Sequence, residues 1–111
     1  MEVKDTQVLK KIYEHAKSVL SYCSECKELN DFQDNSMRVE ACVFNLMQIG
    51  ELAKTSLSDG TKQIIKTIPW NQIYGMRNRI VHGYSGVNMQ IIWDAITDDL
   101  PKLVEELEKY I

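Results

Sequence analysis

The chain has 111 residues, of which 44% are hydrophobic and 26% charged, the balance of a globular protein with one domain, residues 1–111. Its net charge of -3 and pI of about 5.3 exclude a uniformly basic nucleic-acid-binding surface, so any such contact would need a local basic cleft. No stretch approaches the roughly 20 apolar residues that span a bilayer, and the charged N-terminus lacks the apolar run of a signal peptide. We therefore expect a cytoplasmic protein.

Apolar residues recur at spacings of three and four along the chain, a pattern that predicts helices rather than strands. The first helix is predicted from about Asp5 to Leu29, followed by a polar loop rich in Asn and Asp. Ser36 is the predicted N-cap of a second helix, which runs from about Met37 to Leu57.

The second predicted helix carries two apolar stripes. The main stripe includes Gly50 and Ala53, whose small side chains would let a neighbouring helix approach closely. The weaker stripe, on nearly the opposite side, consists of Met37, Ala41, Phe44 and Gln48. A helix with two apolar faces either lies in the centre of the core or contributes to a dimer contact, and the periodicity leaves both interpretations open.

Residues 58–60 interrupt the helical pattern, and residues 61–66 could form a short helical segment. Pro69 then stands where a helix begins, because the first helical position tolerates a missing N–H group. This helix is predicted to end at about His82, and residues 83–86 are predicted to form a turn.

Asn88 is the predicted cap of the last helix, which extends to Ile111. Pro101 should kink or divide this helix, since its ring blocks an intrahelical hydrogen bond. The predicted fold is therefore an all-α antiparallel bundle of four to five helices.

The three cysteines give weak signals. Cys23 and Cys26 form a C-x-x-C pattern, but no second pair or nearby histidine completes a zinc site. With Cys42 the count is odd, which indicates free thiols with a structural role. No other metal-ligand motif is present, so we expect neither a metal site nor a cofactor.

Arg77 lies on the predicted helix at residues 69–82. At 100° per residue it falls inside the apolar arc that contains Ile73, Ile80 and Val81, whereas Arg79 falls at the edge. A guanidinium among apolar side chains is costly unless it is paired, so Arg77 requires either an ionic partner or a phosphate.

His82 is predicted at the end of the same helix, directly before Gly83. An imidazole titrates near neutral pH and can therefore transfer protons. A single histidine more often has a structural role, and we interpret His15, the other histidine of the chain, in that way.

The string Arg77-Asn78-Arg79-Ile80-Val81-His82-Gly83-Tyr84 resembles the signature of the HEPN superfamily, in which His follows Arg after four to six residues. The narrower pattern, Arg-x-x-x-x-His-x-Tyr, resembles the HepT-type toxins, which are partnered with a minimal nucleotidyltransferase antitoxin. Other parts of the chain are similar to that family as well: Cys42 to Ala53 with Ile49-Gly50-Glu51, Pro69-Trp70, and Trp93 with Asp99-Leu100-Pro101.

The resemblance implies a HEPN-like bundle that acts as a metal-independent endoribonuclease toxin. The reaction needs a base and an acid while one chain offers a single plausible histidine, so the chemistry and the weaker apolar stripe both favour a two-fold dimer. Arg77 and His82 match the catalytic pair, and Asn78 matches a polar position that supports the site. Arg79, and with it Lys54, would supply further positive charge near the RNA. Tyr84 matches the tyrosine that the antitoxin modifies with AMP, which neutralises the toxin.

Two alternatives belong to other function classes. A non-catalytic, nucleotide-binding partner of a nucleotidyltransferase would use Arg77 to hold a phosphate and His82 to contact a base or ribose. A purely structural helical dimer is the third interpretation, and the complete Arg-His-Tyr set argues against it. The sequence leaves the choice between ribonuclease and nucleotide-binding module open.

Overall fold

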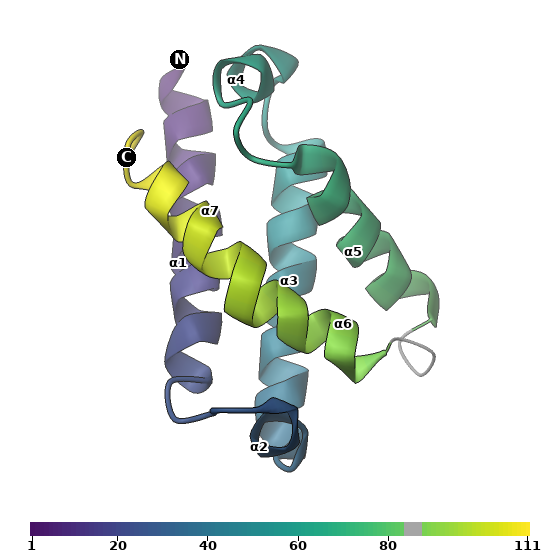
Figure 1. Cartoon of the computed structure of the whole chain (residues 1–111). Coiled ribbons are helices and arrows are strands. Elements are labelled where there is room, and N and C mark those ends of the chain that lie inside the picture. Colours follow the sequence, from purple (N-terminus) through teal and green to yellow (C-terminus); the bar gives the residue numbers. More distant parts are fainter. Residues whose placement is uncertain (84–87) are drawn as a thin grey trace.

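The computed structural model describes the backbone of residues 1–83 and 88–111, and the side chains of residues 1–80 and 88–111. The regular elements in these ranges are all helices, which confirms the predicted all-α fold. Figure 1 shows helices α1 (Val3–Tyr22) and α3 (Ser36–Thr55) running antiparallel, side by side. Within the described ranges, no helix is both long and apolar enough to cross a membrane.

Helix α1 ends about two turns earlier than predicted. A separate short helix, α2 (Leu29–Gln33), occupies the start of the predicted loop. The prediction failed because three polar side chains, of Arg38, Asp31 and Glu28, reorganise the connection. Arg38 donates from Nε to the carbonyl oxygen of Tyr22 at 2.9 Å, which satisfies the end of α1. Asp31 and Glu28 form a reciprocal capping box that starts α2.

The N-cap of α3 is Asn35 and not Ser36, which is instead the first residue of the helix. The side-chain oxygen of Asn35 accepts a hydrogen bond from the backbone N–H of Arg38 at 3.0 Å. Asn and Ser are equally good caps, so composition alone could not decide between neighbouring candidates.

A buried carboxylate joins the start of α1 to the short helix α4 (Asp59–Ile64). Asp5 is only 3% exposed, and its oxygens accept hydrogen bonds from the Thr61 hydroxyl at 2.7 Å and the Ser58 hydroxyl at 2.7 Å. The Ser58 backbone N–H is a third donor, at 3.1 Å. These bonds, that of Thr61 first, hold the pKa of Asp5 below its usual value. The network fixes the end of the bundle from which the next helix starts.

Helix α5 (Trp70–Gly83) begins directly after Pro69, close to the predicted position. Trp70 is buried, and its indole N–H donates to the carbonyl oxygen of Ile65 at 3.0 Å. This bond anchors the first turn of α5 to the segment that follows α4. The predicted turn at residues 83–86 lies, apart from Gly83, outside the described residues.

The C-terminal segment begins with α6 (Met89–Asp94), and the side chain of Asn88 caps it as predicted by accepting from the backbone N–H of Gln90 at 2.8 Å. A π-helical turn (Ala95–Asp99) then leads into α7 (Leu100–Leu107). Pro101 thus divides the last helix, as predicted, and the division takes the form of a widened turn just before the proline.

Helix α3 is central, because both α1 and α5 pack on it. The C-terminal segment runs across α1 and α3, with α7 packed on α1 and α6 on α2 (Figure 1). Phe32 and Trp93 stack with ring centroids 5.6 Å apart where α2 meets α6. In the part of the chain that the structure describes, α5 makes an extensive contact with α3 alone.

The cysteines have the predicted structural role. Cys23 and Cys42 are buried, and their sulfur atoms lie 3.6 Å apart as a hydrogen-bonded pair of free thiols. This bond and burial raise the pKa of the Cys42 thiol, so it stays protonated. Cys26 lies next to them, half-buried and also free.

The weaker stripe of α3 does not face the core. Met37 is 78% exposed and Phe44 57% exposed, while Ala41 and Gln48 are half-buried. Helix α3 is central in the bundle, but Met37 and Phe44 of this stripe are not buried in its core. A contact with another chain stays the prediction for these residues.

Candidate active site

Arg77 lies where α5 crosses α3. A Cβ atom added at Gly50 of α3 would overlap the Cβ of Arg77 and would lie 2.9 Å from its Cγ and 3.3 Å from the carbonyl oxygen of Ile73. The predicted close approach of a neighbouring helix at Gly50 is confirmed. Because glycine has no side chain, the backbone of α5 can bring Arg77 directly against α3.

The guanidinium of Arg77 has the ionic partner that its position on the apolar arc requires. Its Nη2 atom lies 2.7 Å from Oε2 of Glu51, and its Nη1 atom donates to Oδ1 of Asn78 at 2.9 Å. The Arg77 side chain is 23% exposed and that of Glu51 is 44% exposed, so the pair lies at the surface edge of the α3–α5 contact. Sequence reasoning missed Glu51 as the partner.

The other two basic candidates do not join this group. Arg79 is exposed, and its Nε atom lies 3.5 Å from the carbonyl oxygen of Gly75, which is one turn back on α5. Lys54, near the end of α3, is also exposed. Of the candidate residues with described side chains, Arg77 and Asn78 therefore lie together at the α3–α5 contact, where Arg77 meets Glu51.

Position 82 lies in the last turn of α5, as predicted, but the side chain of His82 is outside the described part of the structure. Tyr84 lies outside the described residues altogether. Positions 77 and 82 are separated by five residues of helix, which corresponds to about 140° around the axis and about 7.5 Å along it. The two positions therefore do not share one face of α5.

His15 has the structural role assigned from the sequence. Its Nδ1 atom lies 2.8 Å from Oδ1 of the buried Asn45 on α3, and the amide of Asn45 donates to the carbonyl oxygen of Ala41 at 2.7 Å. The histidine thus links α1 to α3, away from the Arg77 group.

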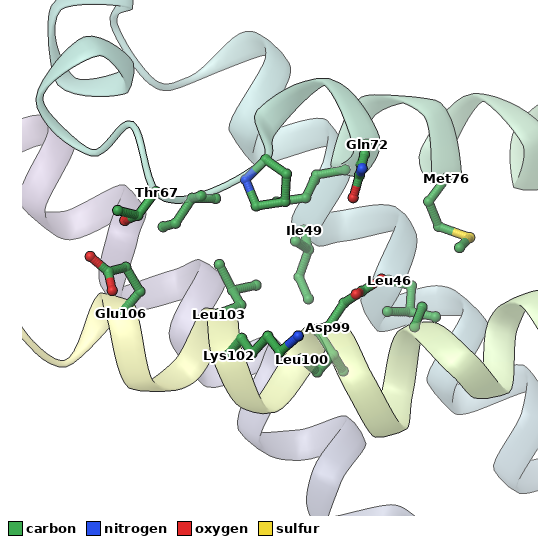
Figure 2. Close-up of a pocket in the computed structure, with 14 residues that line it drawn as sticks. Leu46, Ile49, Thr67, Gln72, Met76, Asp99, Leu100, Lys102, Leu103 and Glu106 are labelled. Atoms are coloured by element: carbon green, nitrogen blue, oxygen red, sulfur yellow. The ribbon is translucent and has the colours of Figure 1, made fainter.

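A cleft of about 370 Å³ lies between α5 and the C-terminal segment, and nothing in the sequence patterns predicted it. Figure 2 shows apolar side chains lining it, among them Leu46 and Ile49 of α3 and Leu103 of α7. Its rim is polar and mixed in charge: Thr67, Gln72, Asp99, Lys102 and Glu106. Arg77, Arg79 and Lys54 are not among the residues that line it, so it is not the basic cleft expected from the sequence.

Asp99 is the rim carboxyl with a raised pKa. Desolvation at the cleft is the main cause, and the negative charge of Asp98 adds to it, while Lys102 acts in the opposite direction.

Among the described residues, His, Cys, Asp and Glu side chains form no group of three or more that could hold a metal ion.

Comparison with known proteins identifies the family of this chain. The profile of a family described as "Ribonuclease HepT-like" matches residues 12–110. This chain belongs to the HepT-like family. Its match to a "Probable ribonuclease HepT" of Thermococcus cleftensis has 32% identity over 79 residues, 71% of each chain.

Two further relatives of this HepT-like chain carry ribonuclease names. A "Putative RNase" of Methanocaldococcus jannaschii is 29% identical over 97 residues, 87% of each chain. A "Putative RNase" of Caldanaerobacter subterraneus subsp. tengcongensis is 33% identical over 81 residues, 73% of this chain and 71% of the relative. No solved structure matches the chain. The resemblance to HepT-type proteins of the HEPN superfamily is thus confirmed, and the enzyme class is ribonuclease.

The contact at Gly50 gives a stability prediction for this HepT-like protein. Gly50→Ala should lower the free energy of unfolding by about 1–3 kcal/mol, because the added methyl group forces α3 and α5 apart. Gly75→Ala is the matched control, since a Cβ at that helical position has no neighbour within 4 Å. It should stabilise the protein by about 0.5–1 kcal/mol. Urea denaturation measures both, and equal effects of the two substitutions would contradict the close contact.

Proposed function

We propose that this HepT-like ribonuclease cleaves RNA without a metal ion, through Arg77 and His82 on α5. The observation that supports this best is the position of Arg77. Its guanidinium is held at the edge of the α3–α5 contact, in partial exposure, by Glu51 and Asn78. A guanidinium fixed by protein acceptors and still open to solvent is suited to bind a phosphate group.

The proposed reaction uses the RNA's own 2′-hydroxyl as nucleophile. Its oxygen attacks the adjacent phosphorus, the bond to the 5′-oxygen breaks, and the products are a 2′,3′-cyclic phosphate and a 5′-hydroxyl. A base must remove the 2′-hydroxyl proton and an acid must protonate the leaving 5′-oxygen, which an imidazole can do near neutral pH. The guanidinium of Arg77 stabilises the negative charge that develops on the phosphoryl oxygens.

This mechanism predicts that His82→Ala reduces the rate of RNA cleavage by about 10²–10⁴-fold, the contribution typical of acid–base catalysis. Arg77→Ala should reduce it by about 10²–10³-fold, the loss typical of removing a group that stabilises transition-state charge. Cleavage of end-labelled RNA in EDTA, with analysis of the product ends, measures the effect. His15→Gln is the control, because the other histidine contacts Asn45 on a different helix and should be dispensable for cleavage.

Retained cleavage by either alanine variant would overturn the assignment. If the wild-type protein binds nucleotides but leaves RNA intact, the alternative of a non-catalytic nucleotide-binding module is favoured instead. A cyclic phosphate at the product 3′ end in EDTA would support the metal-independent reaction.

We further propose that the active form is a two-fold dimer. One chain supplies a single histidine on α5, whereas the reaction needs both a base and an acid, and two chains would supply two histidines and two arginines. The exposed stripe of Met37, Ala41, Phe44 and Gln48 offers a surface for the contact. Burial of an exposed phenylalanine and methionine would stabilise such an interface.

Phe44→Asp should therefore give a monomer in light scattering and reduce RNA cleavage, because it places an unpaired charge in the contact. The matched control is Ile64→Asp, which introduces the same charge at an exposed apolar residue of α4, 55% exposed and outside the stripe. It should leave the dimer intact. A Phe44→Asp protein that remains dimeric would show that the dimer uses another face.

We propose as well that a minimal nucleotidyltransferase neutralises this ribonuclease by transferring AMP from ATP to the hydroxyl of Tyr84, with release of pyrophosphate. The adduct would place a negatively charged phosphodiester and an adenosine two residues from His82, where they compete with RNA for the arginines. The tyrosine follows Gly83 and precedes the Ser85-Gly86 pair, a sequence that suits a segment entering another enzyme's active site.

Co-expression with the cognate nucleotidyltransferase should raise the mass of the chain by whole AMP units and abolish cleavage. The adduct should map to Tyr84 by peptide mass spectrometry. Tyr84→Phe should remain unmodified and keep much of its activity, because the hydroxyl is not the proposed base. An inhibited complex in which Tyr84 is unmodified would show that the antitoxin acts by steric blocking.

A further inference from the structure

Glu51 is the carboxylate that the structure places on the guanidinium of Arg77. It follows Gly50 directly on α3. The glycine permits the close approach of α5, and the next residue, Glu51, forms the ion pair with Arg77. Oε2 of Glu51 lies 2.7 Å from Nη2 of Arg77, which is the distance of a charge-assisted hydrogen bond. Glu51 therefore acts on Arg77 from the opposing helix.

The geometry leaves Arg77 able to bind a phosphate while Glu51 holds it. A guanidinium has five N–H donors, of which a bidentate contact with a phosphate uses two. Glu51 engages Nη2 and Asn78 engages Nη1, one contact each among the described side chains. The Arg77 side chain as a whole is 23% exposed, so it is not sealed in the α3–α5 contact.

A guanidinium held in one position stabilises a transition state more than a mobile guanidinium does. A long arginine side chain loses conformational entropy whenever it is ordered, and if RNA must order it, that cost reduces transition-state stabilisation. Contacts with Glu51 and Asn78 already order the Arg77 side chain in the folded protein, before RNA binds. Asn78 is on the same helix as Arg77, whereas Glu51 is on α3, so Glu51 fixes the guanidinium relative to the rest of the bundle.

We propose that Glu51 is a positioning residue for Arg77, and that it acts as a hydrogen-bond acceptor rather than as a proton-transfer group. This inference rests on the proposed role of Arg77 in RNA cleavage. Its direct consequence is a difference between two substitutions at one position. Glu51→Gln keeps an acceptor oxygen at nearly the same place, while Glu51→Ala removes the acceptor altogether.

Steady-state cleavage of a defined RNA, with kcat and KM measured separately, tests the proposal. Glu51→Ala should lower kcat by about 10- to 100-fold, because a displaced guanidinium no longer meets the phosphoryl oxygens in the transition state. Glu51→Gln should keep kcat within a few-fold of the wild-type value, and its KM should fall because the carboxylate no longer repels the RNA phosphate. Glu14→Ala, at an exposed carboxylate of α1, is the matched control and should change neither constant.

Two measurements that do not depend on cleavage accompany the kinetics. Thermal unfolding should differ little between the variants, because a partly exposed ion pair contributes little to stability. In ¹⁵N NMR spectra, the guanidinium Nη–H signals of Arg77 should be resolved in the wild-type protein and in Glu51→Gln. They should broaden or average in Glu51→Ala, in which Asn78 alone holds the guanidinium.

The possible results separate this inference from the function on which it rests. If the wild-type protein does not cleave RNA, the proposed function fails, and the NMR spectra alone decide whether Glu51 holds Arg77. If the wild-type protein cleaves RNA and Glu51→Ala keeps the wild-type kcat, the positioning role is overturned. If Glu51→Gln is as slow as Glu51→Ala, the ionised carboxylate itself is required, and a role limited to accepting a hydrogen bond is wrong.

Discussion

The close contact of α3 and α5 at Gly50 is the constraint on which the candidate site depends. Because position 50 has no side chain, the first atoms of the Arg77 side chain fit against the backbone of α3. The guanidinium then emerges at the edge of the contact and meets Glu51, the next residue of α3. The close approach of α5 to α3 thus determines both the burial of the aliphatic part of the Arg77 side chain and its pairing with Glu51.

Much of this arrangement could be predicted because it follows from local patterns. The apolar periodicity gave the main helices, and the small residues of the second helix indicated the close approach at Gly50. Pro69, Asn88 and Pro101 marked helix boundaries, since the backbone chemistry of proline and the capping ability of asparagine do not depend on distant parts of the chain. The position of Arg77 on an apolar arc correctly indicated that it needs a partner.

Several of the features that escaped prediction depend on contacts between residues far apart in the sequence. The early end of α1 rests on Arg38, which lies 16 residues from the carbonyl group it satisfies. The pairing of Glu51 with Arg77 could not be distinguished from the many other acidic residues of the chain without the crossing of α3 and α5. The cleft between α5 and the C-terminal segment is lined by residues from helices distant in the sequence, and periodicity within one helix does not encode how such helices lie relative to one another.

The one-sided packing of α5 has a consequence for how the protein loses activity on heating. Helices α1 and α3 are held from several sides, whereas α5 has α3 as its extensive contact in the described structure and faces the cleft on another side. A helix with one interface detaches at a lower free-energy cost than the whole bundle, as a separate cooperative unit. Such a local opening separates Arg77 from Glu51 while the α1–α3 core stays folded. Heating would then inactivate the protein through detachment of α5 before the bundle melts, and redocking of that one helix would restore the pair.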